Sequence, residues 1–391
     1  MRIAFCELGL NGLPSQVMNP FSLSPYVGEE YFCDRIEETK RIVGAFKNKR
    51  PLTLISLRRL GKTGLIQHVH HQLPKRVLKI YLDINDTSSD EEFANKLILR
   101  CISELNRKKK NTVQRAIELF SQFRAGITID PLTGTPSLSV ELGSPSDVKH
   151  SIHTLFAMLA ESGLSIQLAI DEFQRIAEYP ETTIDATVRE AMHANPDLHI
   201  IFSGSKKHLL VDLFSDASRP LFGSTEIMHL AKIDYPSYMA FVKKHFAEVD
   251  KTIDDNQVHH ILEWTKMHTY YTQYFCNLLF QHTEVTVTDT LIEVVKNLIF
   301  KSNESTYYLF RNLLTGAQWD LLKAIASEDE MHQPTSSDIR NKYALGASST
   351  VSRSLDALLD KEMIYNNITS DHSSYEVYDV FLSRWLQQYN S

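Results

Sequence analysis

Short apolar runs alternate with stretches of helical spacing over the first 235 residues or so. Four runs have the length and β-branched content of strands: "LTLISL" (52–57), "VLKIYLDI" (77–84), "SIQLAI" (165–170) and "LHIIFSG" (198–204). Strands that alternate with helices are typical of an α/β domain with a mainly parallel sheet. The pattern therefore predicts such a domain in this part of the chain.

The alternation is interrupted once and then stops. Residues 125–147 switch between apolar and polar positions around "PLTG", which predicts an exposed hairpin inserted into the domain. After about residue 235, "YPSYMAFVKKHF", "DNQVHHILEWTKM" and "YYTQYFCNLLFQH" have the spacing of amphipathic helices. A helical subdomain is therefore expected to follow the sheet.

The last 80 residues have a third pattern. "GAQWDLLKAIA", "TSSDIRNKYA" and "ASSTVSRSLDALLDKEMI" are helical, and the strand-like runs of "YNNITSDHSSYEVYD" follow them. This order predicts a winged helix-turn-helix. The expected divisions are an N-terminal segment (1–28), the α/β domain (29–235), a helical lid subdomain (236–310) and the winged-helix domain (311–391).

Composition narrows the class of protein. With 391 residues, 43% hydrophobic and 23% charged, the chain is long enough for two or three domains with cores of their own. A net charge of −7 gives no overall case for binding nucleic acid or an anionic membrane. No apolar run approaches the roughly 18 residues that span a bilayer, and the N-terminus does not resemble a secretory signal. We therefore expect a cytoplasmic protein without a membrane segment.

The four cysteines agree with this expectation. Cys6, Cys33, Cys101 and Cys276 lie far apart and form no CxxC pair, so structural thiols are favoured over a disulfide framework or a zinc site. His68 and His71 share a helix face but have no acidic or cysteine partner nearby in the sequence. A structural or solvent-facing role is therefore favoured over metal binding.

The charge of the winged-helix region argues against duplex DNA as its ligand. From Thr315 to Ser391 there are 6 Lys and Arg against 11 Asp and Glu, whereas a phosphate-binding module is expected to be basic. The third helix offers several hydroxyls and Arg353, but also Asp356 and Asp360. An intramolecular or protein-binding role is favoured, and DNA binding stays as the alternative. "NRKKKN" (106–111) is the one dense basic cluster, and such clusters are typical of a solvated helix end.

A phosphate-binding loop is the clearest chemical signal. "SLRRLGKT" (56–63) follows the first predicted strand and keeps Gly61, Lys62 and Thr63 of the G-x-x-x-x-G-K-[ST] pattern, with Ser56 at the first glycine. In such a loop the backbone N–H groups and the start of the next helix hold phosphate. Lys62 reaches the outer phosphates, and Thr63 is a ligand of Mg²⁺. The alternative is a basic turn capped by a glycine.

Two carboxylates downstream favour the nucleotide interpretation. In "LAIDEF", a predicted strand ends at Asp171 and Glu172, an arrangement in which one carboxylate orders Mg²⁺ and the next activates water. The strand "HIIFSGS" ends at Ser203 and Ser205. These hydroxyls could contact phosphate or water if their strand lies between the other two, and otherwise they are turn residues.

These stretches together resemble the archaeal-type P-loop ATPase family, a STAND-branch group related to AAA+ proteins, in its Bacteroides-like version. "SLRRLGKTGLI" is similar to that family's S-P-R-R-x-G-K-T-x-L-I loop, with Leu57 in place of proline, and "AIDEFQRI" is similar to its acidic strand. "YFCDRIEETKRI" resembles the segment beside adenine, F-x-G-R-x-x-E, with Asp34 in place of glycine. The resemblance runs from about Asn19 to Leu386.

Two further residues enter through this resemblance alone. Arg219 lies in a segment that supplies the family with an arginine near the nucleotide or a neighbouring domain, and the alternative is a surface arginine paired with an acidic neighbour. His268 lies in "TKMHTYYTQ", which is similar to the family's G-H-P-Y-Y-x-Q segment, with Met267 and Thr269 in place of glycine and proline. There the histidine approaches the phosphates, and the alternative is a buried interface histidine.

The resulting hypothesis is an ATPase of P-loop NTPase fold, with a parallel sheet, a helical lid and a C-terminal winged helix. ATP, ADP and Mg²⁺ are the expected ligands, Glu172, Lys62 and Arg219 the expected catalytic residues, and Thr63 and Asp171 the expected metal ligands. Nucleotide contacts are expected from Phe32, Arg35, Arg58, Arg59, Leu60, Gly61, Lys62, Thr63, Gly64, Ser203, Ser205 and His268. The resemblance implies slow turnover, as suits a molecular switch with a protein partner or self-association. The alternatives are a DNA-binding regulator with a structural nucleotide and a degenerate ATPase that scaffolds a partner.

Overall fold

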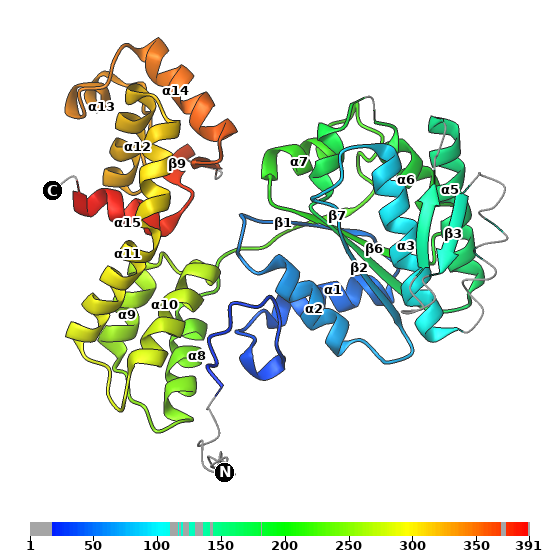
Figure 1. The fold of residues 1–391 in the computed structure, drawn as a ribbon, viewed down its shortest axis with the longest axis horizontal. Helices are drawn as coiled ribbons and strands as arrows, with labels where there is room; N and C mark the ends of the chain where they lie inside the picture. The colour runs from blue at the N-terminus through cyan, green and yellow to red at the C-terminus, as the bar shows by residue number, and fades with distance from the viewer. Residues whose placement is uncertain are drawn as a thin grey trace, which may run out of the picture. The chain divides into compact units, whose positions relative to one another are not determined.

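The computed structural model describes residues 18–109, 116, 119, 125–129, 136–140, 144–180, 182–368 and 373–389. These residues divide into two compact units (Figure 1). The sheet unit runs from Ser24 to Ile233, and the helical unit joins the residues up to Leu23 to those from Asp234 onward. Among the described residues, no helix is both long and apolar enough to cross a membrane.

A five-stranded sheet forms the centre of the sheet unit. Its strands are β1 (Leu52–Ile55), β2 (Leu78–Asp83), β5 (Ile166–Asp171), β6 (His199–Gly204) and β7 (Glu226–His229). They are all parallel and lie in the order β2-β5-β6-β1-β7. The four strands predicted from the sequence correspond to β1, β2, β5 and β6, and β6 does lie between β1 and β5. The carboxyl ends of these three strands therefore meet at one edge of the sheet.

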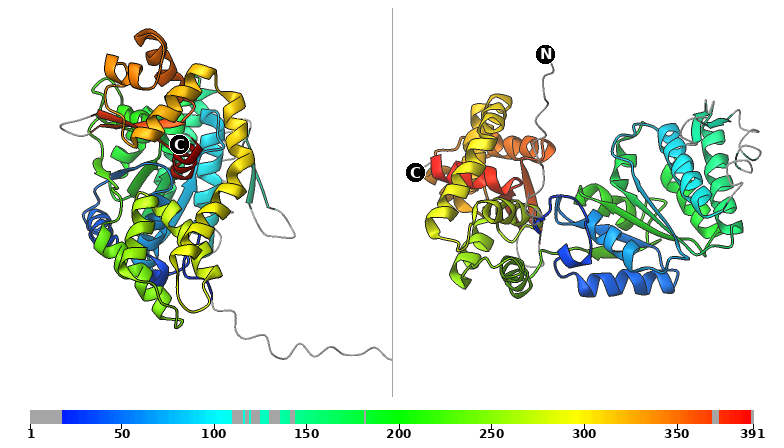
Figure 2. Two further views of the ribbon diagram at one scale, coloured as in Figure 1. Left: turned by 90° about the vertical axis from the view of Figure 1, so that its left-hand side faces the viewer. Right: turned by 60° about the horizontal axis from the view of Figure 1, so that its bottom comes forward.

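Helices cover both faces of this sheet (Figures 1 and 2). The helices and 3₁₀ turns of the unit are η1 (Glu29–Tyr31), α1 (Ile36–Lys47), α2 (Lys62–Gln72), α3 (Asp90–Lys108), α5 (Pro145–Glu161), η3 (Phe173–Glu178), α6 (Ile184–Ala194) and α7 (Lys207–Ser215). One apolar core joins α3, α5, α6 and α7 to the sheet, and a second joins α1 and α2 to the opposite face. The helices on both faces explain why every residue of β1, β5 and β6 is buried, whereas β2 alternates buried with more exposed positions.

The alternating stretch near residue 130 forms an antiparallel pair. Strands β3 (Ala125–Ile129) and β4 (Pro136–Val140) pair with Ala125 opposite Val140. The turn between them, with "PLTG", lies outside the described residues, as do the last two residues of "NRKKKN".

The helical unit contains the helices expected of the lid subdomain (236–310), called the lid helices below, and those of the winged helix. Its helices are α8 (Tyr235–Ala247), α9 (Asp255–Trp264), α10 (Thr269–His282), α11 (Asp289–Leu313), α12 (Gly316–Glu328), α13 (Ser337–Lys342), α14 (Ser348–Asp360) and α15 (Val380–Tyr389). Strands β8 (Ile364–Ile368) and β9 (Ser373–Val377) form an antiparallel hairpin after α14. The three helices and hairpin expected of a winged helix are therefore present, and α15 adds a helix that the sequence pattern did not predict.

The chain before Leu23 also belongs to the helical unit. Asn19 Nδ2 donates a hydrogen bond to the Asn277 carbonyl, and Asn277 Nδ2 donates one to the Phe21 carbonyl, at 2.9 and 2.8 Å. The fully buried Phe21 ring contacts the rings of Phe241, His245, Phe246 and Phe280. A segment from the start of the chain is thus anchored among helices that lie more than half the chain away.

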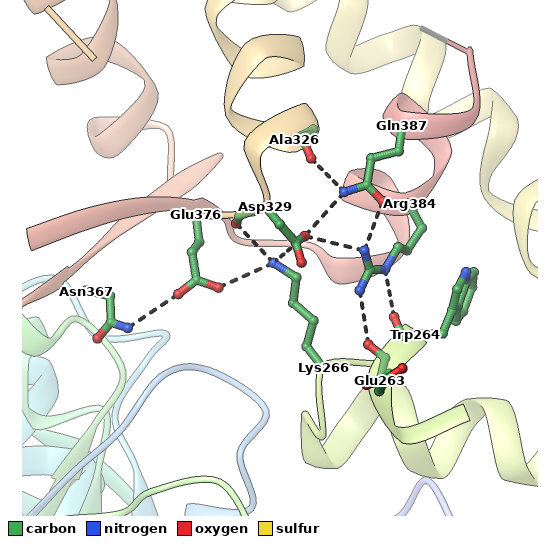
Figure 3. Close-up of polar contacts among 9 residues, drawn as sticks. All are labelled: Glu263, Trp264, Lys266, Ala326, Asp329, Asn367, Glu376, Arg384 and Gln387. Carbon is green, nitrogen blue, oxygen red and sulfur yellow. Dashed lines mark hydrogen bonds and ion pairs between the residues drawn. The ribbon is translucent and has the colours of Figure 1, made fainter. Parts of the chain in front are cut away.

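A network of charges joins the winged helix to the α9–α10 turn (Figure 3). Lys266 Nζ lies 2.9 Å from Asp329 Oδ1 and 3.3 Å from Oε2 of the buried Glu376 on β9. Arg384 of α15 donates hydrogen bonds to the carbonyls of Glu263 and Trp264 at the end of α9. Burial raises the pKa of Asp329, but Lys266 and Arg384 outweigh this effect and hold it below its usual value. The lid helices and the winged helix therefore belong to one packed unit.

Candidate functional site

The predicted phosphate loop connects β1 to α2 at the carboxyl edge of the sheet. It spans Ser56 to Gly61, and α2 begins at Lys62. Gly61 has a φ of 98°, a conformation that favours glycine, and as the residue before α2 it has no side chain that could cap the helix. Those N–H groups and the positive end of the helix dipole can therefore bind an anion.

Lys62 is buried beneath this loop. Its Nζ lies 3.3 Å from Ser56 Oγ and 3.4 Å from the Leu57 carbonyl. Burial lowers the pKa of Lys62, while the carboxylates of Asp171 and Glu172 oppose that change. Ser56 does not have the positive φ that would require a glycine, and its hydroxyl contacts Lys62. The departure from the loop pattern at Ser56 is thus compatible with the geometry.

Asp171 connects three elements at the end of β5. Its Oδ2 accepts hydrogen bonds from Thr63 Oγ1 at 2.8 Å and from the Tyr81 hydroxyl at 2.6 Å. Its Oδ1 accepts one from Ser203 Oγ at 2.6 Å. The carboxylate is buried, so these donors compensate for lost hydration. Residues that are 108 positions apart in the sequence, Thr63 and Asp171, are thereby in direct contact.

This pair has the donor chemistry of a magnesium site. Mg²⁺ binds oxygen ligands, keeps several waters and is usually held by one or two carboxylates together with substrate phosphates. Thr63 and Asp171 supply one hydroxyl and one carboxylate beside the phosphate loop. Within the described residues there is no group of three or more His, Cys, Asp and Glu side chains that could form an all-protein metal cage.

Glu172 follows Asp171 and turns its carboxylate in another direction. Its backbone is left-handed, with a φ of 57°. Its Oε2 accepts hydrogen bonds from Ser205 Oγ at 2.9 Å and from Gln174 Nε2 at 2.6 Å. Arg58 Nε donates to Ser205 Oγ at 3.3 Å, so a chain of polar contacts runs from Glu172 to the phosphate loop.

The segment expected beside the nucleotide base lies against the same loop. Phe32 stacks on His68 of α2, with ring centroids 4.3 Å apart, and Tyr26 packs against both rings. Arg35 is buried and donates hydrogen bonds to Glu38 and to the Leu60 carbonyl of the loop, at 2.9 and 3.4 Å.

Glycine is needed at Gly64 because Pro25 approaches α2 there. A Cβ at Gly64 would lie 2.5 Å from the Pro25 carbonyl oxygen. The N-terminal segment therefore reaches α2 one turn from the loop.

Three predicted residues differ from the buried residues of this cluster: Arg219 and Arg59 are partly or fully exposed, and His268 belongs to the other unit. Arg219 Nη2 is 3.1 Å from Asp212 Oδ2, and both side chains are partly exposed, as the surface-pair alternative describes. Arg59 is exposed, with a φ of 61°. His268 is buried next to Tyr271 at the start of α10 in the helical unit, whereas Lys62 belongs to the sheet unit. A nucleotide-sensing role for His268 therefore stays a prediction.

Two site residues were not predicted from the sequence. Tyr81 on β2 and Gln174 on η3 donate hydrogen bonds to Asp171 and Glu172. Burial, with Asp171 nearby, raises the pKa of Tyr81, so its hydroxyl is a stable donor. Tyr81 could have been predicted only with the strand order in hand. In the structure β2 lies beside β5, with Asp83 opposite Asp171.

Comparisons with known proteins identify the C-terminal region and the overall fold. Residues 305–388 match a family described as a probable winged helix domain. A search of curated proteins found no match.

Solved structures are similar along nearly the whole chain. The Walker-type ATPase of Pyrococcus abyssi is 22% identical, covers 94% of this chain and 99% of its own, and gives a TM-score of 0.61. The ORC2 protein of Aeropyrum pernix, in ADPNP-ADP complexes, is 11% identical, covers 95% and 96%, and gives a TM-score of 0.55. Its ADP form is 10% identical, covers 95% and 97%, and gives a TM-score of 0.51.

At these identities the likeness concerns the fold. Both proteins align with this chain over both units, and the strand order and the winged-helix match agree with the alignments. The chain therefore has the fold of the P-loop ATPases, with a parallel five-stranded sheet and a C-terminal winged helix.

Proposed function

We propose that this chain binds Mg-ATP at the carboxyl edge of the sheet unit and hydrolyses it slowly to ADP and phosphate. The observation that carries this proposal is the direct contact of Thr63 with Asp171, beside the buried Lys62 and the half-exposed Glu172. Each of the four is the residue type that ATP hydrolysis needs at its position. An ordinary basic turn would not require a buried lysine beside two carboxylates.

Each residue has a separate role in this proposal. Lys62 and the first N–H groups of α2 bind the outer phosphates, and Thr63 and Asp171 hold Mg²⁺. Magnesium, when bound, would offset the negative charge of the phosphates. Glu172 accepts a proton from the attacking water.

The remaining predicted contacts belong to the same proposal. Ser203 fixes Asp171, and Ser205 fixes Glu172. Phe32 and Arg35 lie beside the nucleotide base. The loop residues Arg58, Arg59, Leu60 and Gly61 surround the phosphates, together with Gly64 at the start of α2. Arg219 from the sheet unit and His268 from the helical unit are proposed to contact the nucleotide as well.

The nucleotide state is proposed to act as a switch. Lid helices and winged helix share one unit through the network around Lys266. Any preference of ATP for one arrangement would therefore act on both together. We further propose that the chain is a STAND-branch ATPase that works in the cytoplasm on a protein partner or on its own copies. The buried cysteines Cys33, Cys101 and Cys276 suit that compartment.

Magnesium-dependent ATP binding and hydrolysis of the purified chain test this proposal. Lys62→Ala is expected to lose ATP binding, because the phosphate charge is no longer offset. Glu172→Gln is expected to bind ATP without turnover, because an amide cannot accept the proton. If none of the three proteins binds ATP, the proposed function is wrong and the scaffold alternative takes its place.

DNA binding is the second candidate, because residues 305–388 match a winged-helix family. The exposed face of α14 carries Ser349, Ser352 and Arg353, but also Asp356 and Asp360. Retention on duplex DNA that weakens as salt rises would support this candidate. Failure to bind DNA at low salt would contradict it.

A further inference from the structure

Among the described residues, Gln174 makes a shorter hydrogen bond to the Glu172 carboxylate than Ser205 does. It lies in η3, two residues after Glu172, and its side chain is buried. Nε2 donates to Glu172 Oε2 at 2.6 Å. A hydrogen bond to a charged acceptor is stronger than a neutral one and fixes the geometry of both partners.

A glycine on β6 makes room for this amide. A Cβ at Gly204 would lie 1.8 Å from Gln174 Oε1 and 2.9 Å from its Cδ. The Gln174 side chain therefore occupies space that any other residue at position 204 would fill. Gln174 Oε1 is buried and has no hydrogen-bond partner among the described residues. Such a group costs free energy, so stability alone does not explain the glutamine.

The two carboxylate oxygens of Glu172 have different hydrogen-bond partners. Ser205 Oγ and Gln174 Nε2 both donate to Oε2, and no donor to Oε1 occurs in the part of the chain that the structure describes. The carboxylate can therefore present Oε1 while Oε2 is held. The left-handed backbone of Glu172 is a strained conformation that persists only where surrounding contacts impose it.

We propose that Gln174 is a positioning residue for hydrolysis. The Gln174 amide lies in the space left by the missing side chain of Gly204, called the slot below, and holds Oε2 from there. Oε1 is thereby turned toward the attacking water. This inference rests on the proposed function, in which a proton passes from that water to Glu172 as the water oxygen attacks phosphorus. Gln174 itself touches neither the nucleotide nor the water.

Two substitutions test the proposal in the full-length chain. Gln174→Met keeps the length of the side chain but has no N–H donor. Gly204→Ala keeps the glutamine but pushes its amide out of the slot. Each is expected to lower kcat for ATP roughly 10- to 100-fold, the range for a misplaced catalytic group. KM and the Kd for ATP should change by no more than about twofold, because phosphate binding is untouched.

The double variant provides the decisive control. In a Gln174→Ala background the slot is empty, so adding Gly204→Ala should cost no further activity. If the two losses multiply instead, Gly204 acts independently of Gln174 and the proposal is wrong. Unchanged kcat in Gln174→Met would also overturn it, provided that wild type hydrolyses ATP.

Failure of the proposed function gives a different result. In that case wild type itself would show no magnesium-dependent turnover, and both statements would be wrong. Thermal unfolding and ATP binding identify a variant that has not folded. If Gln174→Met does not fold, the kcat of Gly204→Ala tests the proposal. If Gly204→Ala does not fold, the kcat of Gln174→Met tests it.

Discussion

At the residue scale, several predicted site residues have a left-handed backbone. Arg35, Arg59 and Glu172 have φ values of 63°, 61° and 57°. For residues with a side chain this conformation costs on the order of 1 kcal/mol or more and persists where surrounding contacts impose it. All three lie at the phosphate loop or the adjoining strand end. Other described residues such as Asp250 and Asp329 share this conformation, so strain accompanies the predicted nucleotide contacts without being confined to them.

Two histidines far from that edge are expected to make stability depend on pH. Burial lowers the pKa of His70 and of His199 to about 4, and neither ring Nε2 has a hydrogen-bond partner among the described residues. In the unfolded chain both titrate near 6.5. Protons therefore favour the unfolded chain as the pH falls from about 6.5 to 4, and stability should decrease in that window.

Denaturant unfolding at several pH values measures this effect. The free energy of unfolding should fall by about 3 kcal/mol through the buried His199, at roughly 1.4 kcal/mol per pKa unit. The decrease through the partly exposed His70 should be smaller. His199→Leu should flatten the profile between pH 6.5 and 4, and His71→Gln, at an exposed position of the same helix as His70, should leave it unchanged. An identical slope in wild type and His199→Leu would refute the assignment.

At the element scale, the sequence was sufficient for strands rich in apolar and β-branched residues. Strands β1, β2, β5 and β6 were predicted because the polar residues within them, such as Thr53, Lys79 and Gln167, are isolated positions. Strand β7 was not predicted, since its four residues include Glu226 and His229, and Glu226 pairs with Arg41 and Arg50 at the sheet edge. Helix α15 has an amphipathic pattern too short to separate from the preceding loop.

Part of the candidate site was also predictable from the sequence. Lys62, Thr63, Asp171, Glu172, Ser203 and Ser205 come together because the ends of parallel strands meet at one edge. Tyr81 and Gln174 could not be predicted, because their roles depend on the β2–β5 register and on the space at Gly204. Pairwise packing of this kind leaves no periodic signal in a sequence.

Two glycines in neighbouring helices should respond in opposite ways to alanine. Gly64→Ala places a Cβ 2.5 Å from the Pro25 carbonyl oxygen, and we expect a loss of roughly 1–3 kcal/mol from overpacking. Gly44→Ala in α1 meets no atom within 4 Å and should gain about 0.5–1 kcal/mol from helix propensity. Denaturant unfolding compares the two. A stabilised Gly64→Ala variant would show that Pro25 does not approach α2.

At the scale of the whole molecule, the charge network around Lys266 should hold the winged helix to the lid helices. Lys266→Met would leave the Glu376 carboxylate buried without its cation, since the two side chains are only 10% and 3% exposed. Removing one partner of a buried pair costs about 3–5 kcal/mol. We therefore expect a clear loss of stability in the helical unit.

Removing both charges should reverse most of that loss. Lys266→Met with Glu376→Gln leaves no unpaired buried charge, so the double variant should unfold closer to wild type. Thermal unfolding with limited proteolysis between α11 and α12 compares the variants. If the double variant is as unstable as Lys266→Met alone, packing and not charge joins these parts.

The burial of Phe21 in the helical unit has a consequence for synthesis on the ribosome. Phe21 emerges before the whole sheet unit, whereas its partners on α8 and α10 emerge only after it. At roughly 5–20 residues per second, the delay is on the order of 10 to 40 seconds. During that time the sheet unit has all of its residues available, but this aromatic anchor has no partner to bind. The segment around Phe21 is therefore among the last parts to reach its native place.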